Sequence, residues 1–295
     1  MAGPSFVLAG GTVEASRPSP GLYVVATPIG NLGDITVRAL EVLASADVIA
    51  CEDTRKSRVL MERYGLTTPL TAYHDHNGPQ ARPALLQRLT DGEVVALISD
   101  AGTPLIADPG YKLVVAAREA GHSVFSVPGP SALTAALSIA GQPTDQFSFH
   151  GFLPAKAKAR ADAIAGLAEL PGTLCLYEAP SRLADSLAAL SDGLGADRLA
   201  SVVRELTKTF ETVNQATLGD LAQHYSEDEA PRGEIVIIIG PAPAREVSQE
   251  DVDAALRTAL ATQRTKDAAA EVAKAFDLPK RDVYQRALAL RDEDA

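Results

Sequence analysis

The chain has 295 residues, 46% of them hydrophobic, which predicts a globular protein of two domains with a small third unit. Its formal net charge of −11 argues against a general electrostatic clamp on nucleic acid but leaves room for a local basic patch. No apolar stretch approaches the roughly 20 residues that cross a bilayer, and the two cysteines, Cys51 and Cys175, lie in apolar runs typical of buried thiols in a reducing cytosol rather than of a disulfide.

The first twenty residues are rich in Gly, Ser, Ala and Pro and lack a basic start, so we expect residues 1–20 to be a disordered tail and not a signal peptide. After them, short apolar runs alternate with helical patterns. Thr36 can cap a helix that extends to residue 46, and an apolar stripe predicts another helix from about residue 111. Strands are predicted at residues 22–26, 48–51, 94–98 and 123–127. This order favours a largely parallel sheet with helices on both faces, over residues 21–150.

A second α/β domain is predicted over residues 151–240. Its strands are expected at residues 173–177, 199–203, 210–213 and 234–239, and its helices at 180–190 and 218–225. Residues 241–244, Pro-Ala-Pro-Ala, interrupt the pattern and predict a linker.

Apolar periodicity predicts three helices in a last domain, residues 246–295, with Thr265 as a cap and a turn at residues 277–279. Two helices joined by such a turn are typical of a helix-turn-helix, whose last helix here would hold Lys280, Arg281 and Arg286. The pattern alone favours the other interpretation, a small packing bundle with solvated charges.

The most informative segment is the loop of residues 99–110, which follows the predicted strand 94–98. Open α/β sheets bind ligands at the carboxyl ends of their strands. Gly102 would let backbone N–H groups approach a ligand, Asp100 supplies an acceptor, and Asp108 with Pro109 is typical of a helix N-cap and first turn. A plain strand–turn–helix connection uses the same residue types, so both interpretations stay open.

Two further loops follow strands at the same predicted edge. Residues 27–34 follow the first strand, and residues 128–132 form a rigid turn in which Ser131 starts a helix. The free N–H groups of such a helix start suit a carboxylate or a phosphate. We expect these loops and the 99–110 loop to wall one pocket.

Polar clusters after two other strands have competing interpretations. Residues 52–56 are typical either of catalysis or of a capped, self-neutralised helix start. His74, Asp75 and His76 have types and spacing that can ligate zinc, but no partner cluster supports this. We therefore expect no metal and interpret this polar loop as a contact with nucleic acid or substrate.

The densest uncompensated basic run is Lys156, Lys158 and Arg160, which is typical either of a solvated linker or of phosphate contacts. Residues 204–208 combine cations, an acid and a hydroxyl, as an ion-pair network or an active-site wall does. The sequence has no P-loop lysine, Gly-x-Gly-x-x-Gly or Gly-x-Ser-x-Gly signature, so an ordinary NTPase, dinucleotide enzyme or serine hydrolase is poorly supported. Residue chemistry alone predicts an α/β protein with a small-ligand cleft between domains.

At these motifs the sequence resembles the bacterial ribosomal RNA small subunit methyltransferase I group of the tetrapyrrole-methylase-like superfamily. The C-terminal helices are similar to the small extra domain of these enzymes. Departures from the family pattern are Gly78, where an acid is common, and Ala179 and Ser181, where Ser and His are common. The resemblance extends from about residue 22 to 240 and rests on seven motifs in order: residues 27–32, 52–55, 74–77, 99–110, 128–130, 151–154 and 204–208.

The resemblance implies two α/β domains of the tetrapyrrole methylase type with a cofactor cleft between them, plus a small C-terminal helical domain. It implies a homodimeric, cytoplasmic enzyme that uses S-adenosyl-L-methionine to methylate the ribose 2′-hydroxyl of a decoding-centre cytidine in 16S rRNA. The matching cofactor contacts are Pro28, Asp100, Gly102, Thr103, Ile106, Ser131, Ala132, Tyr177, Leu206 and Gly233.

Removal of the ribose proton calls for a carboxylate or a desolvated lysine near the hydroxyl. We nominate Glu205 and Lys208 as catalytic residues, with Glu178 in reserve. The expected substrate contacts are Arg55, His76, Lys156, Lys158 and Arg160. Two alternatives stay open: a same-fold methyltransferase that acts on a tetrapyrrole, and a non-enzymatic ribosome-binding factor that has lost its cofactor.

Overall fold

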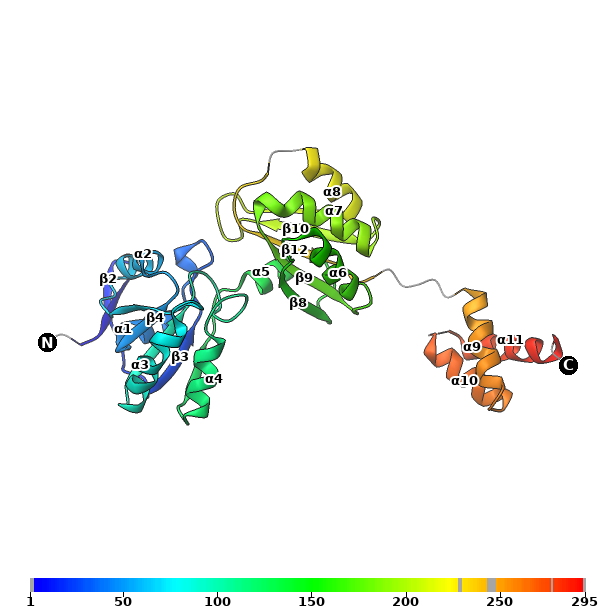
Figure 1. Cartoon of the computed structure of the whole chain (residues 1–295), viewed down its shortest axis with the longest axis horizontal. Coiled ribbons are helices and arrows are strands. Elements are labelled where there is room, and N and C mark those ends of the chain that lie inside the picture. Colours follow the sequence, from blue (N-terminus) through cyan, green and yellow to red (C-terminus); the bar gives the residue numbers. More distant parts are fainter. Residues whose placement is uncertain (1–2, 228–229, 243–247, 277, 294–295) are drawn as a thin grey trace. The chain divides into compact units, whose positions relative to one another are not determined.

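Two five-stranded sheets, an N-terminal hairpin and a separate group of helices make up the described chain (Figure 1). The computed structural model describes residues 3–227, 230–242, 248–276 and 278–293, and it divides the chain into two units, residues 1–242 and 243–295. Both five-stranded sheets belong to the first unit. Within it, we call the described residues up to 131 the first lobe and those of 132–242 the second lobe.

The first lobe is built on a parallel sheet with the strand order β5-β4-β6-β3-β7. The four strands predicted here are confirmed within one residue at each end, whereas β5 is too short for a periodic signal and was not predicted. The strands are β3 (Gly21–Val25), β4 (Val48–Cys51), β5 (Leu70–Ala72), β6 (Val94–Ile98) and β7 (Val124–Val127). The helices are α1 (Val37–Ser45), α2 (Thr54–Tyr64), α3 (Gly78–Thr90) and α4 (Tyr111–Glu119), with a 3-10 turn at Leu32–Asp34.

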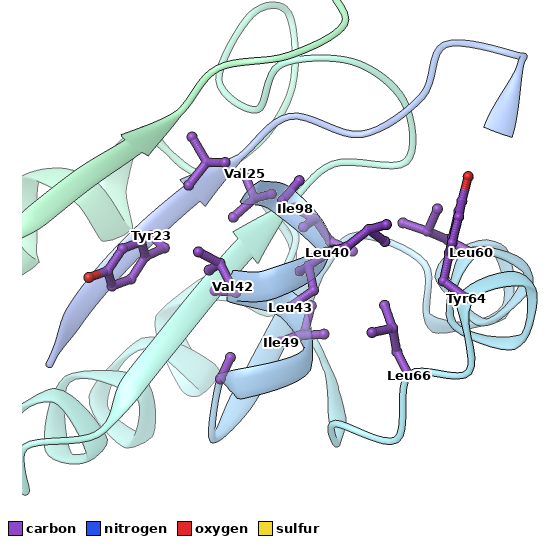
Figure 2. Packing of buried hydrophobic residues seen from close by; sticks show 14 of the residues in the cluster. Tyr23, Val25, Leu40, Val42, Leu43, Ile49, Leu60, Tyr64, Leu66 and Ile98 are labelled. Carbon is purple, nitrogen blue, oxygen red and sulfur yellow. The ribbon is translucent and has the colours of Figure 1, made fainter. Parts of the chain in front are cut away.

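Helices cover both faces of this sheet, as the alternation of strands and helices predicts. On one face, Leu40 and Leu43 of α1 pack with Leu60 of α2 in a large buried cluster (Figure 2). On the other face, Leu89 of α3 and Leu113 of α4 belong to a second cluster. Strands β4 and β6 are buried along their whole length, which is why they are continuous apolar runs in the sequence.

The N-terminal segment is not a disordered tail in its described part. β1 (Ser5–Leu8) pairs antiparallel with β2 (Gly11–Glu14) through a turn in which Ala9 and Gly10 both have positive φ. Phe6 is 1% exposed and packs into the cluster beneath α1 and α2. The prediction was wrong because composition is dominated by the polar, small residues of the hairpin, whereas one buried aromatic side chain anchors it.

The second lobe is built on a sheet with the order β11-β10-β12-β9-β8, in which the β8–β9 pair is parallel and the other three pairs are antiparallel. Helix α5 packs on one face, and the other helices contribute to a buried cluster on the other. The strands are β8 (Phe147–Phe152), β9 (Thr173–Glu178), β10 (Leu199–Arg204), β11 (Thr212–Thr217) and β12 (Ile235–Ile239). The helices are α5 (Ala132–Ile139), α6 (Ala157–Leu167), α7 (Leu183–Leu194) and α8 (Leu218–Glu227), with a 3-10 turn at Pro180–Arg182.

Three boundaries in this lobe differ from the predictions. Strand β8 was not predicted and crosses the predicted domain boundary at residue 150, because its partly exposed Ser, His and Gly residues interrupt the apolar pattern. Strand β11 lies at Thr212–Thr217 instead of 210–213, because it is an edge strand with no buried residue and therefore has a weak apolar pattern. Helix α5 already packs on the second sheet, so the lobe boundary precedes residue 132.

The second unit contains α9 (Gln249–Leu260), α10 (Thr265–Ala275) and α11 (Lys280–Glu293) in its described part, with apolar side chains of all three in one small core. Thr265 is the first residue of α10 and not its cap, which is Arg264. The predicted linker at 241–244 and the turn at 277–279 lie partly outside the described residues. In the ranges described, no helix is long and apolar enough to cross a membrane.

One of the cations predicted on the last helix is used inside this unit. Arg286 donates from Nε and Nη2 to the two carboxylate oxygens of Asp253, at 2.7 and 2.6 Å. Lys280 and Arg281 are exposed. Arg286 therefore joins α11 to α9, as the interpretation of a small packing bundle predicts.

We expect Asp253→Asn to destabilise this unit by about 1–3 kcal/mol, because it removes the charged partner of Arg286. Hydrogen bonds from Arg286 hold the pKa of Asp253 at about 2. A carboxyl whose pKa is lowered by folding stabilises the fold above its unfolded pKa of about 3.9 and loses this contribution as the pH falls towards 2. Thermal unfolding of the full chain at pH 7 and pH 3 measures the effect, with the exposed Asp282→Asn as the control. Equal unfolding temperatures for the two variants at pH 7 would show that the pair is neutral.

Candidate functional site

Three loops of the first lobe meet at the carboxyl edge of its sheet. Thr27, after β3, and Gly102, after β6, form an antiparallel bridge with N···O distances of 2.9 and 3.0 Å. The hydroxyl of Thr103 donates to the carbonyl oxygen of Pro130, after β7, at 3.1 Å. The three loops that were expected to wall one pocket are thus bonded to one another.

The loop of residues 99–110 has an unusual backbone. Leu105 and Ala107 have positive φ, 73° and 61°, a conformation that is uncommon outside glycine and clusters at functional sites. Gly110, with φ 133°, is the N-cap of α4, so the prediction that Asp108 caps this helix is wrong. Asp108 instead lies on the wall of a cavity.

This cavity has a volume of about 350 Å³ and lies between the loops of the first lobe and the second lobe, within the usual range for small-molecule sites. The second lobe contributes the end of β9, the start of β12 and the loop after β10. Eight of the ten predicted cofactor contacts line it: Gly102, Thr103, Ile106, Ser131, Ala132, Tyr177, Leu206 and Gly233. The other residues that line the cavity were not among the predicted cofactor contacts: Ile29, Ala101, Ala107, Asp108, Phe152, Glu178, Ala179, Pro180, Glu234, Ile235 and Val236.

Among the described residues, the charged groups that line this cavity are all acidic: Asp108, Glu178 and Glu234. Glu178 is 3% exposed, and its carboxylate accepts hydrogen bonds from the next residue's N–H and from the Ser186 hydroxyl. Glu234 pairs with Lys208 at 3.1 Å. Asp108 makes no ion pair with any described residue, so its charge is the one left for a ligand.

The pKa of Asp108 is raised to about 6, chiefly by burial and then by the nearby carboxylate of Glu52, while the Ser99 hydroxyl and Lys56 offset part of the shift. Ionising this carboxyl at neutral pH therefore costs free energy, which a cation bound beside it would offset. A small, positively charged ligand suits this cavity.

One side of the cavity is aromatic and apolar. The Tyr177 ring lies edge-to-face with Phe149 and Phe152, at centroid distances of 4.8 and 5.7 Å. Phe152 is 53% exposed although it lines the cavity. Leu206 and Val236 extend the apolar wall. Such a surface fits a flat heterocycle.

A second hollow of about 220 Å³ adjoins the cavity and shares Ile29, Ala101 and Glu234 with it. The other two predicted cofactor contacts, Pro28 and Asp100, line this hollow and not the cavity. The ten residues therefore fall on two neighbouring spaces at one edge of the sheet.

The start of α2 borders the second hollow. Asp53 caps this helix by accepting from the Arg55 N–H at 2.8 Å, and the Arg55 guanidinium returns to the same carboxylate at 2.7 Å. Asp100 accepts from the Asp53 N–H at 3.0 Å and from Lys56 Nζ at 2.8 Å. The self-neutralised helix start, one of the two interpretations of residues 52–56, is confirmed.

The loop after β10 brings an ion-pair network to the other side of the hollow. Lys208 Nζ donates to Glu205 Oε1 at 2.8 Å and to Glu234 Oε2 at 3.1 Å. The stem of Lys208 lies across Gly30, where an added Cβ would come within 2.4 Å of Lys208 Cε. Glu205 has a positive φ of 55° and lines neither space.

The ion pairs of this network shift the pKa values of Glu205 and Lys208 in opposite directions. The hydrogen bond from Lys208 lowers the pKa of Glu205. Burial on its own lowers the pKa of Lys208, but the bonds to Glu205 and Glu234 outweigh it and raise that pKa. The raised pKa keeps Lys208 as an ammonium group, so the catalytic part predicted for Lys208 is that of a cation and not of a base.

The expected substrate contacts fall into two groups. Four of the five, Arg55, His76, Lys156 and Lys158, are exposed. Arg160, in contrast, has an 11% exposed side chain that faces Asp185 of α7 at 4.0 Å, so it lies between packed helices and not on the surface. Over the part of the chain that the structure describes, no group of three His, Cys, Asp or Glu side chains is placed to hold a metal.

Two family models match the chain. The model of tetrapyrrole (corrin/porphyrin) methylases matches residues 21–222, and the model of the RsmI C-terminal HTH domain matches residues 246–291. Proteins named ribosomal RNA small subunit methyltransferase I are 50% identical in Mesorhizobium japonicum, over 97% of both chains, and 48% identical in Escherichia coli O157:H7, over 90% of this chain and 94% of that one.

Solved structures share the fold at lower identity. A cobalt precorrin-4 methyltransferase is 19% identical with a TM-score of 0.57, covering 74% of this chain and 94% of that one. The uroporphyrin-III C-methyltransferase of Thermus thermophilus, solved in complex with S-adenosylhomocysteine, is 20% identical with a TM-score of 0.53, covering 75% and 97%.

Proposed function

The chain belongs to the tetrapyrrole (corrin/porphyrin) methylase family, among relatives named ribosomal RNA small subunit methyltransferase I, and is an S-adenosylmethionine-dependent rRNA methyltransferase; we propose that its target is the ribose 2′-hydroxyl of a decoding-centre cytidine in 16S rRNA. The relatives' names support the class of reaction and substrate. The position of the methyl group and the identity of the nucleotide are the proposal.

The observation that supports this cofactor most directly is the charge of the cavity. S-adenosylmethionine has positive charge on its sulfonium and ammonium groups, and the cavity offers carboxylates and no cation among its described lining residues. The ring of Tyr177 and the exposed face of Phe152 suit its adenine. Backbone N–H groups at the start of α5, next to Ser131, suit its carboxylate. The residues present therefore fit this cofactor, and we assign Asp108 as the counter-charge.

When bound, S-adenosylmethionine supplies an activated methyl group on its sulfonium. The chain's own residues then have to hold the acceptor hydroxyl in line with that methyl and take up its proton. The carboxylate of Glu178, at the end of β9, is already engaged by the Ala179 N–H, the Ser186 hydroxyl and the Arg182 guanidinium. We assign proton transfer to the network of Glu205, Lys208 and Glu234, in which the Lys208 ammonium holds the acceptor oxygen, Glu234, which lines both spaces, receives the proton, and Glu205, which lines neither, fixes Lys208 in place.

We expect Lys156→Glu to weaken binding of the RNA substrate several-fold and to flatten its salt dependence by about one unit of slope, because an exposed phosphate contact is lost. Affinity for S-adenosylmethionine should stay unchanged. Filter binding across a salt series measures this, with Arg118→Glu on α4 as a control of equal charge change. Equal RNA affinity for the two variants would remove Lys156 from the RNA contacts.

We further propose an assembly state and a cellular location for the enzyme. We place the enzyme in the cytoplasm, with ribosomal subunits as its partner, and we propose a homodimer. Large apolar side chains that stay exposed in the single chain, such as Phe147, Phe210 and Val213, support a further protein contact. Sedimentation of the purified protein at micromolar concentration tests the dimer.

The test of the substrate class is a choice of acceptors. Purified protein is given labelled S-adenosylmethionine together with either small ribosomal subunits or a tetrapyrrole such as uroporphyrinogen III. Label in RNA alone supports the proposal. Label in the tetrapyrrole alone would favour the same-fold alternative, and cofactor binding without any transfer would contradict both. A protein that binds no cofactor would leave the ribosome-binding factor.

A further inference from the structure

Helix α2 is unusually basic for this chain. Its residues Thr54–Tyr64 include Arg55, Lys56, Arg58 and Arg63 but one carboxylate, Glu62, in a protein of net charge −11. All five of these side chains are exposed. The opposite face of the helix packs into the core of the first lobe, so the cations share one solvent-facing side.

Two of these cations are neutralised by carboxylates and two are not. Arg55 pairs with Asp53, and Lys56 pairs with Asp100. Arg58 and Arg63 make no ion pair with any described residue. The uncompensated positive charge of the helix therefore lies at these two arginines.

The same helix forms one wall of the second hollow. Lys56 and Val59 of α2 line it, together with Lys208 from the loop after β10. The hollow shares Ile29 and Glu234 with the cofactor cavity, so a group that occupies it lies directly beside the cofactor. The lining holds two ammonium groups, Lys56 and Lys208, and two carboxylates, Asp100 and Glu234, and this polar surface suits the hydroxyls of a ribose better than a purely apolar ligand.

We propose that a single strand of the RNA substrate crosses the exposed face of α2, with phosphates on Arg58 and Arg63, and inserts its target nucleotide into the second hollow between Lys56 and Lys208. This inference rests on the proposed function, since it names where the rRNA binds. A single strand is the form in which a ribose and base can leave the stack and enter a hollow of about 220 Å³. The exposed arginines complement the charge of any acidic partner. RNA is favoured over an acidic protein because one of its nucleotides can enter the hollow beside the helix and reach the cofactor.

The first test is the double variant Arg58→Glu/Arg63→Glu, compared with Arg118→Glu on α4. We expect KM for small ribosomal subunits to rise at least tenfold and the salt slope of RNA binding to fall by about 1.4, at about 0.7 for each phosphate contact to a single strand. The affinity for S-adenosylmethionine should equal that of the wild type, which shows that the variant is folded. A double variant that behaves like Arg118→Glu overturns the docking surface.

The second test fills the hollow without touching the cofactor cavity. Val59 is exposed and lines only the hollow, so Val59→Trp should reduce kcat/KM for methyl transfer at least tenfold while leaving cofactor affinity unchanged. Val13→Trp on β2 is the matched control, since Val13 is an exposed valine that lines neither space. Equal kcat/KM for the two tryptophan variants overturns the placement of the nucleotide.

These experiments distinguish failure of RNA docking on α2 from failure of the methyltransferase activity itself. If the wild type methylates rRNA but neither variant differs from its control, the docking inference is wrong and the proposed function stands. If the wild type transfers no methyl group to rRNA, the proposed function fails and the docking inference fails with it.

Discussion

Replacing Gly102 by valine is expected to abolish binding of S-adenosylmethionine, with a rise in Kd of at least a hundredfold. Gly102 has a φ of +78°, which a β-branched residue rarely adopts. An added Cβ would come 3.2 Å from Ile29 Cγ2, on the cavity wall, and the larger side chain would occupy ligand space. The substitution also disturbs the bridge to Thr27, which holds two of the three first-lobe loops together. Isothermal titration calorimetry measures the loss.

Gly92 offers a matched control for this experiment. It has the same φ of +78°, but an added Cβ there meets nothing within 4 Å, and it lies outside the cavity. Gly92→Val therefore reproduces the backbone strain without the steric block. We expect it to lower the unfolding temperature and to bind the cofactor normally. Normal binding by Gly102→Val would place the cofactor elsewhere.

Asp108→Asn is expected to raise the Kd for S-adenosylmethionine by thirtyfold or more, since loss of one partner of a desolvated charge pair costs about 2–5 kcal/mol. S-adenosylhomocysteine lacks the sulfonium charge, so its affinity should fall less if Asp108 faces that group. Asp192→Asn, an exposed carboxyl on α7, is the control. A variant with wild-type affinity for both compounds would contradict the assignment of Asp108 as counter-charge.

The pKa of Asp108, raised to about 6, gives this prediction a pH dependence. The carboxylate has to be ionised to bind a cation, so affinity should fall about tenfold between pH 7 and pH 5 in the wild type. The dependence should be absent in Asp108→Asn. Because folding raises this pKa, ionisation of Asp108 destabilises the unliganded fold as the pH rises from about 3.9 to about 6, and the full cost remains at pH 7. The variant should therefore unfold at the same or a higher temperature at pH 7, which separates lost binding from lost folding.

The parts of the fold that could be predicted from the sequence are those that have a local sequence pattern. The apolar runs of β4, β6, β9 and β12 and the cap at Thr36, which accepts from the Ala39 N–H, were all predictable because burial on both faces and capping leave direct marks. The hairpin of β1 and β2 and the edge strand β8 were not predicted, and β11 was placed at residues 210–213, because few of the residues in these strands are buried and the apolar pattern is weak.

In the candidate site, too, some features could be predicted from local sequence patterns and others could not. The loops were predictable from their positions after strands, and the family resemblance selected eight residues that line one cavity. Asp108 was misassigned because Asp-Pro before a helix usually marks an N-cap, whereas Gly110 takes that place here. The ammonium state of Lys208 depends on Glu205, three residues away, and on Glu234, 26 positions away, and no local pattern reveals the second partner.

The most direct test of the central claim is transfer of labelled methyl from S-adenosylmethionine to small ribosomal subunits that lack the modification, followed by nuclease digestion and mapping of the labelled nucleotide. We predict one labelled residue, a decoding-centre cytidine with the methyl group on its ribose 2′-oxygen, and no transfer by Gly102→Val. Label on a base, on a nucleotide outside the decoding centre, or on no RNA at all would contradict it.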